Sequence, residues 1–160
     1  MERQILTILE QDARTPASKI AVMLGKSEQV IVNAIEEMQK RGIIRHYKTI
    51  VDWDKAGKER VFAFIDVRVT PRKGVGYDEI AREIYKYDAV HSVFLVSGDF
   101  DLRVVVEGKT MQEVAFFVAE KLSNLEGVLS TRTNFLLKKY KDGGDIFDDT
   151  GEDYRLAVAP

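Results

Sequence analysis

The chain has 160 residues, of which 45% are hydrophobic, and it contains no cysteine. This length can bury one core or two small ones, and the lack of cysteine excludes disulfides, thiolate nucleophiles and cysteine-type zinc sites. The net charge is −2, yet residues 1–48 carry eight Lys and Arg against six Asp and Glu. The N-terminal third thus has a net charge of +2, a small asymmetry in the direction that nucleic-acid binding requires.

Two further classes of protein are excluded by simple features. The histidines are His46 and His91 alone, so histidine ligands for a metal are few and we expect no metal site. We also expect no cofactor. No apolar run approaches the roughly 18 residues of a membrane span, and the charged segment after Met1 does not resemble a signal peptide. We therefore expect a cytoplasmic protein with no membrane partner.

Three short amphipathic helices are predicted at the N-terminus, the first over residues 2–12. Thr15 followed by Pro16 is typical of an N-cap with proline at the first helical position, so the second helix covers 16–24 and closes at Gly25. Ser27 caps a third helix, which Gly42 ends. The predicted buried stripes contain Ile5, Leu6, Ile8, Leu9, Ile20, Ala21, Leu24, Ile31, Ile35 and Met38.

The tight turn at Gly25 makes residues 1–46 a predicted helix-turn-helix domain. Three such helices also form small caps in proteins that bind no DNA, but the turn length and the charge asymmetry favour DNA binding. The N-terminal exposed residues of the third helix then face base edges, and Gln29 and Asn33 suit adenine. The expected DNA contacts, with the basic groups on phosphates, are Lys26, Ser27, Gln29, Asn33, Lys40, Arg41 and Arg45.

Residues 47–59 are predicted to form a linking strand and connector, and residues 60–140 a second domain. The segment 60–70 alternates in polarity, which predicts a half-buried strand with Asp66 and Arg68 on one face. A turn over 71–76 and a helix over 77–87 follow. Another helix begins at Thr110 and breaks at Gly127, before a last strand over 128–140. We treat the Met, Phe and Tyr side chains of these two helices, Tyr85 among them, as core.

A hairpin is predicted between the two helices, where apolar runs flank the sequence Ser-Gly-Asp-Phe-Asp at 97–101. A turn needs glycine at one place and has no need of two acids, so this turn is also a candidate binding site. The alternative is that Asp99 and Asp101 merely cap the turn, because Asx turns use the same residues.

The order strand, helix, strand, strand, helix, strand is the ferredoxin-like βαββαβ pattern. The predicted fold class is therefore α+β, with an N-terminal (winged) helix-turn-helix followed by a ferredoxin-like sandwich. Two helices on one face of the sheet leave the other face uncovered, which is typical of pairing with a second copy. Residues 141–160 are expected to form an acidic, solvated and mobile tail.

With these parts placed, residues 1–140 resemble the Lrp/AsnC (leucine-responsive, or feast/famine) transcriptional regulators. The sequence Val-Ser-Gly-Asp-Phe-Asp at 96–101 is similar to the family's Val-Thr/Ser-Gly-Asp-Tyr/Phe-Asp turn. Further similar stretches are Leu-Glu-Gly-Val at 125–128, Thr-Arg-Thr at 131–133, Asp-Ala-Arg at 12–14 and Arg-Gly-Ile-Ile at 41–44.

The resemblance implies a regulator, not an enzyme, that binds promoter DNA as an oligomer and responds to an amino acid or related small metabolite. It also implies that homodimers assemble into tetramers or octamers, with the effector bound between dimers. Carboxylates suit an α-ammonium group, and hydroxyls and backbone N–H groups suit an α-carboxylate. The implied effector-binding residues are Ser97, Gly98, Asp99, Asp101, Thr131 and Thr133.

Two alternatives remain open, the first because of a departure from the family and the second because of a shared architecture. The family's third helix commonly reads Thr-Val-x-Arg-Arg-Ile, whereas residues 30–35 read Val-Ile-Val-Asn-Ala-Ile and lack both arginines. The first alternative is a metabolite-binding or assembly module with a degenerate helix-turn-helix. The second is an enzyme, because sirohaem decarboxylases resemble the same two-part architecture, although no nucleophile and base can be assembled around His91.

Overall fold

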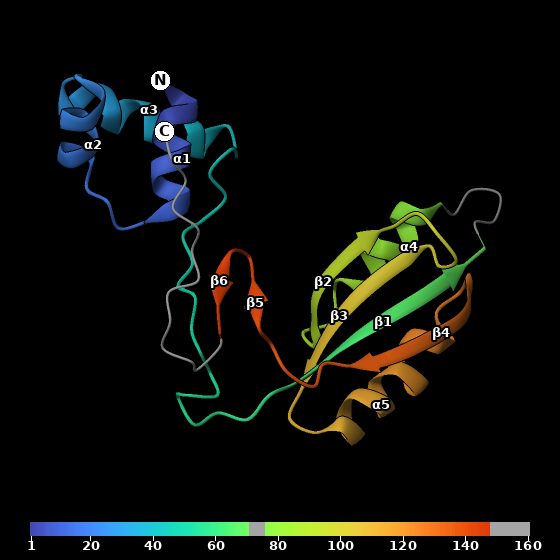
Figure 1. Ribbon diagram of the computed structural model, residues 1–160. Helices are drawn as coiled ribbons and strands as arrows, with labels where there is room; N and C mark the ends of the chain where they lie inside the picture. The colour runs from blue at the N-terminus through green and yellow to red at the C-terminus, as the bar shows by residue number, and fades with distance from the viewer. Residues whose placement is uncertain (71–75, 148–160) are drawn as a thin grey trace. The chain divides into compact units, whose positions relative to one another are not determined.

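A computed structural model of the chain describes residues 1–70 and 76–147. The chain divides into two compact units, one spanning Met1–Val51 and the other beginning at Asp52 (Figure 1). None of the described helices is long and apolar enough to span a membrane.

The first unit consists of three helices, α1 (Glu2–Gln11), α2 (Ala17–Leu24) and α3 (Glu28–Lys40). The predicted apolar stripes meet in one core, which confirms the predicted helices. Leu6, Ile8, Leu24 and Ile35 pack around that core at partial exposure. Its buried members are Ile5, Leu9, Ile20, Ala21, Ile31 and Met38.

The turn between α2 and α3 forms as predicted, while the start of α2 differs by one residue. Gly25 has φ of +61°, a left-handed conformation that glycine adopts without steric cost. Pro16 is itself the extended N-cap residue of α2, so the prediction that Thr15 is the cap is wrong. Helix boundaries shift by one or two residues because the last turns are held by few hydrogen bonds.

Residues 45–52 have no regular secondary structure, so the expected linking strand is absent from the single chain. A strand exists only where its backbone groups pair with a neighbouring strand, and no described segment of this chain pairs with these residues. Tyr47 and Ile50 on this segment are exposed. No strand serves as a wing among residues 1–60 either.

The second unit holds a four-stranded antiparallel sheet of β1 (Val61–Val69), β2 (Val90–Leu95), β3 (Leu102–Gly108) and β4 (Val128–Phe135). The strand order is β2-β3-β1-β4. Helix α4 (Tyr77–Ile84) follows β1, and α5 (Met111–Glu120) with a short 3-10 turn (Leu122–Asn124) follows β3. This is the predicted ferredoxin-like arrangement.

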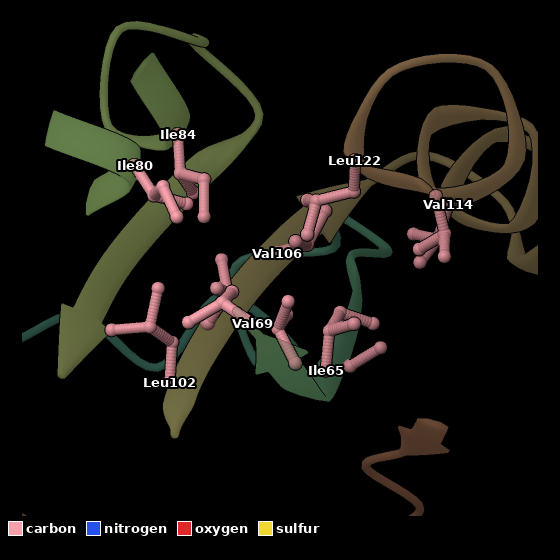
Figure 2. Close-up of a cluster of buried hydrophobic side chains, with 12 residues drawn as sticks. Ile65, Val69, Ile80, Ile84, Leu102, Val106, Val114 and Leu122 are labelled. Carbon is pink, nitrogen blue, oxygen red and sulfur yellow. The ribbon is translucent and has the colours of Figure 1, made fainter. Parts of the chain in front are cut away.

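Both helices pack on the same face of the sheet (Figure 2). Ile80 and Ile84 of α4, with Val114 of α5 and Leu122, meet the strand side chains Ile65, Val69, Leu102 and Val106. Because side chains alternate along a strand, Asp66 and Arg68 lie on the opposite face, as predicted. We call that opposite face the open face of the sheet.

Three predictions about this unit are wrong. Helix α4 ends at Ile84, and Tyr85 is 59% exposed because it lies about 100° around the helix from Ile84. Phe116 on α5 is also exposed, as is Met111, so these side chains are not core. Strand β4 stops at Phe135 and not at Tyr140, because its partner β1 begins at Val61 and the Leu136 amide already donates to the Phe62 carbonyl.

The predicted acidic tail begins with structure. Residues Lys141–Asp142 (β5) and Asp145–Ile146 (β6) pair as a small hairpin around Gly143 and Gly144, which have positive φ. The rest of that tail, and all but the last residue of the predicted turn at 71–76, lie outside the described residues.

Candidate effector site and nucleic-acid interface

The hairpin turn between β2 and β3 is fastened to β1 by Asp101. The Asp101 amide donates to the Val67 carbonyl at 3.1 Å, and its carboxylate accepts from the Val69 amide at 2.9 Å. The second carboxylate oxygen lies 3.5 Å from the Tyr77 hydroxyl, at the limit of a hydrogen bond. Asp101 therefore holds the turn in position against β1.

Asp99 is held differently, through its backbone. Arg68 donates from Nε and Nη2 to the Asp99 carbonyl oxygen at 3.0 and 2.6 Å. This leaves the side chain of Asp99 exposed beside exposed Ser97 and Gly98. Gly98 has φ of +131°, which other residues rarely adopt. The turn thus presents a fixed backbone with one solvent-facing carboxylate.

Thr131 and Thr133 lie on β4 opposite Val67 and Ile65, so their side chains point to the helix-covered face. Both are partly buried, and the Thr131 hydroxyl lies 3.4 Å from the Ser123 hydroxyl. Strand β1 separates β4 from the hairpin, so the turn and these threonines are roughly 10 Å apart, two strand spacings. A single chain does not bring the six predicted effector residues together around one point.

An open cavity of about 400 Å³ lies elsewhere, between α4 and the segment before β4. Its lining includes Ile80, Tyr85 and Leu125, and none of the six predicted effector residues belongs to it.

The open face carries a charged cluster that sequence reasoning missed. Asp66 is only 2% exposed, and its carboxylate accepts from Arg103 Nε at 2.8 Å and Arg132 Nη2 at 3.3 Å. The hydrogen bond from Arg103 lowers the pKa of Asp66, and Arg132 adds to this effect, while burial opposes it. Asn134 also approaches, with its amide nitrogen 3.4 Å from the carboxylate.

Phe100 joins the hairpin turn to this cluster. The guanidinium carbons of Arg68 and Arg132 lie 5.3 and 4.5 Å from the centre of its ring. These distances are those of cation–π contacts. The alternation of β1 had placed Asp66 and Arg68 on this face, but the convergence of Arg103 and Arg132 depends on strand pairings that are distant in sequence.

The predicted DNA contacts lie on the surface of the helix-turn-helix. Lys26, Ser27, Lys40 and Arg45 are exposed. Gln29 and Asn33 are also exposed. Their side chains are hydrogen-bonded to each other, with Gln29 Nε2 donating to Asn33 Oδ1 at 2.8 Å. Arg41 differs, because its guanidinium forms an ion pair with Glu2 at 2.9 Å and so holds α3 to α1.

Comparison with known proteins places both units in families. Residues 62–146 match the Lrp/AsnC ligand binding domain, and residues 1–45 match a winged helix-turn-helix DNA-binding domain. The chain is 44% identical over 160 residues to YugG of Bacillus subtilis (strain 168), an uncharacterised HTH-type transcriptional regulator, covering 99% of this chain and 96% of that protein. It is 29% identical over 140 residues to the HTH-type transcriptional regulator LrpA of Pyrococcus abyssi, covering 88% and 96%.

Solved structures show the same fold. Escherichia coli AsnC superposes with a TM-score of 0.68 at 22% identity, over 86% of this chain and 91% of that one. The transcriptional regulator NMB0573 of Neisseria meningitidis, solved as an L-methionine complex, has a TM-score of 0.72 at 22% identity, over 88% and 90%.

Both YugG and LrpA are transcriptional regulators, which decides against the sirohaem-decarboxylase alternative. The residues that match the helix-turn-helix family form the three-helix unit, and the residues that match the ligand-binding domain contain the βαββαβ sheet. This chain belongs to the Lrp/AsnC family of transcriptional regulators and is not an enzyme.

Proposed function

We propose that this regulator binds promoter DNA as an oligomer and changes its DNA binding in response to an amino acid or a related small metabolite. The effector contacts the hairpin turn at Ser97, Gly98 and Asp99. The observation that carries this proposal is that Arg68 and Asp101 fix the turn while the Asp99 carboxylate remains exposed. A fixed anion of this kind suits an α-ammonium group.

The proposed effector site is shared between subunits. Thr131 and Thr133 point to the helix-covered face of the sheet and lie away from the hairpin turn of their own chain. In this proposal they therefore contact an effector that is held by the turn of a neighbouring subunit. The Neisseria meningitidis regulator was solved with L-methionine bound, which supports an amino acid as the class of effector. Asp101 belongs to the proposed site as the residue that positions the turn.

The proposed dimer forms through the open face of the sheet. Phe94 on β2 lies opposite Arg103 and is 53% exposed, so a large apolar side chain occupies that face beside the charged cluster. Large exposed apolar groups on one face are typical of an interface. Dimers then assemble into tetramers or octamers, and such an oligomer presents several helix-turn-helix units to one DNA duplex, which raises its avidity.

The proposed DNA contacts are Lys26, Lys40 and Arg45 on phosphates, Ser27 at the helix start, and Gln29 and Asn33 at base edges, with Arg41 chiefly holding α3 to α1. A DNA-binding regulator of this kind works in the cytoplasm, which we propose as its location.

A second candidate is favoured by the composition of α3. The exposed residues Glu36 and Glu37 carry the wrong sign for phosphate, and the helix has no arginine. A metabolite-binding assembly module with a degenerate helix-turn-helix would have these features.

One experiment separates the two candidates. The full chain is titrated onto its own promoter region and onto a scrambled duplex of equal length, at moderate salt, in a fluorescence anisotropy assay. The regulator binds the promoter more tightly than the scrambled duplex, and an amino acid changes that affinity. Equal affinity for the two duplexes, with and without amino acids, contradicts the proposed function and favours the assembly module.

A further inference from the structure

We propose that α3 reads A·T base pairs, with Asn33 on an adenine edge, Gln29 holding the Asn33 amide in place, and Val30 against a thymine methyl group. This inference rests on the proposed DNA binding and specifies which bases the helix reads.

The hydrogen bond between the Gln29 and Asn33 side chains orients the Asn33 amide, which is the group proposed to contact adenine. Gln29 Nε2 donates to Asn33 Oδ1 at 2.8 Å across one helical turn. An amide oxygen accepts two hydrogen bonds, so Asn33 keeps one acceptor position and both of its N–H donors. The major-groove edge of adenine offers the N6 donor beside the N7 acceptor. A held amide with one acceptor beside one donor matches that edge.

The Asn33 amide does not match the major-groove edge of guanine in the same way. Its major-groove edge presents two acceptors, N7 and O6, which Arg or Lys satisfies with two donors. Residues 28–39 of α3 contain neither Lys nor Arg. The oxygen of the Asn33 amide would face O6 of guanine without a hydrogen between them. The Asn33 amide therefore matches both groups of the adenine edge, whereas on guanine its oxygen is left facing an acceptor.

Val30 lies beside the amide pair. It is 41% exposed and precedes Asn33 by three residues, which makes the two neighbours on the helix surface. The thymine C5-methyl is the apolar group of the major groove, and apolar side chains contact it. An exposed valine next to an adenine-reading amide thus fits thymine in the neighbouring pair.

The acidic residues restrict which part of α3 enters the groove. Glu36 and Glu37 are exposed one turn beyond Asn33, where they repel phosphates. Only the first two turns of the helix are therefore suited to the groove, which is where helix-turn-helix proteins make base contacts. Glu28 also lies at that end and would accept from cytosine, but it projects roughly 140° around the helix axis from Asn33.

The test begins with selection of duplexes from a randomised pool by the full chain at moderate salt. Anisotropy titrations of the selected duplex, and of versions with single A·T to G·C replacements, are then repeated with Asn33→Ala, Gln29→Ala and Gln39→Ala. Gln39 is an exposed glutamine of the same helix, outside the proposed reading surface, and serves as the matched control. Circular dichroism confirms that each variant is folded.

The proposal predicts A·T pairs at the selected positions. One A·T to G·C replacement weakens wild-type binding by roughly 5- to 150-fold, and that same replacement has little effect on Asn33→Ala. Gln29→Ala loses part of the discrimination, and Gln39→Ala keeps all of it.

Two results overturn the inference while leaving DNA binding intact: selection of G·C pairs at the positions read by α3, or unchanged discrimination in Asn33→Ala. Failure of the folded wild-type chain to select any duplex contradicts the proposed function itself, and the inference with it.

Discussion

Asp66 on β1 and Arg103 on β3 lie directly opposite each other in the sheet, and Arg103 Nε donates to Asp66 Oδ1 at 2.8 Å. Arg132 on β4 approaches the same carboxylate from the other side. One buried acid thus links three neighbouring strands of the open face. The arginines are 50% and 59% exposed at their side chains, so water reaches their side of the cluster.

Replacing Asp66 with alanine should destabilise the second unit. The change removes the common acceptor of two arginines at a position that is only 2% exposed. We expect a loss of about 1–3 kcal/mol in the free energy of unfolding, because a hydrogen bond to a charged group in a partly solvated site contributes on this order. Urea denaturation measures it. Lys86→Ala, which removes the exposed Lys86–Glu83 pair, is the matched control and should change stability by under about 0.5 kcal/mol. Equal effects of the two changes would contradict the importance of the cluster.

Lowering the pH should reduce the free energy of unfolding, partly because the Asp66 carboxylate becomes protonated. The pKa of Asp66 is lowered in the folded chain, so its stabilisation is complete above the unfolded pKa of about 3.9 and is lost as pH falls through the lower folded value. We expect Asp66→Asn to lose less stability than the wild type between about pH 5 and pH 3. Urea denaturation at several pH values tests this, and parallel pH curves for the two proteins would speak against it.

Substitutions at Asp99 and Asp101 separate ligand binding by the hairpin turn from the stability of that turn. Asp101 accepts the Val69 amide, so Asp101→Ala should cost about 1–2 kcal/mol of stability and also impair the response to effector. The Asp99 side chain is exposed while its carbonyl holds Arg68, so Asp99→Ala should leave the melting temperature nearly unchanged. It should nevertheless abolish the thermal shift caused by the amino acid that stabilises the wild type. A full ligand shift in Asp99→Ala would show that this carboxylate holds no ligand.

A charge on the open face should break the proposed dimer. Phe94→Glu replaces an exposed phenylalanine with an acid, so the proposed interface loses a large apolar side chain and must desolvate an additional charge, which is costly even beside Arg103. Sedimentation velocity should show a smaller species than the wild type at equal concentration. Phe116→Glu, on the helix α5 and equally exposed at 54%, is the control. The same sedimentation coefficient for Phe94→Glu and the wild type would place the interface elsewhere.

The sequence predicts those parts of this protein that local periodicity determines. The stripe of Ile5 and Leu9 repeats at 3.6 residues, and the alternation around Asp66 repeats at two, so helices, strands and the exposed side of β1 follow directly. Gly25 marks its turn because that position has positive φ. The order of helices and strands along the chain predicts the ferredoxin-like arrangement.

The parts that were missed depend on contacts between distant segments. Arg103 and Arg132 reach Asp66 across separations of 37 and 66 residues, and no local pattern encodes that register. Tyr85 was wrongly assigned to the core because it lies about 100° around the helix from the buried Ile84, outside the apolar stripe. The small hairpin at 141–146 did have a local signal, since adjacent glycines at 143 and 144 are typical of a two-residue hairpin turn.

The most direct test of a ligand-responsive DNA-binding regulator is the affinity of the full chain for its own promoter, measured by fluorescence anisotropy with and without the amino acid that most raises its thermal stability. We predict tighter binding to the promoter than to a scrambled duplex of equal length, and a change in that affinity of about 5-fold or more when the amino acid is present. An affinity that is the same for both duplexes and unaffected by the amino acid would contradict this prediction.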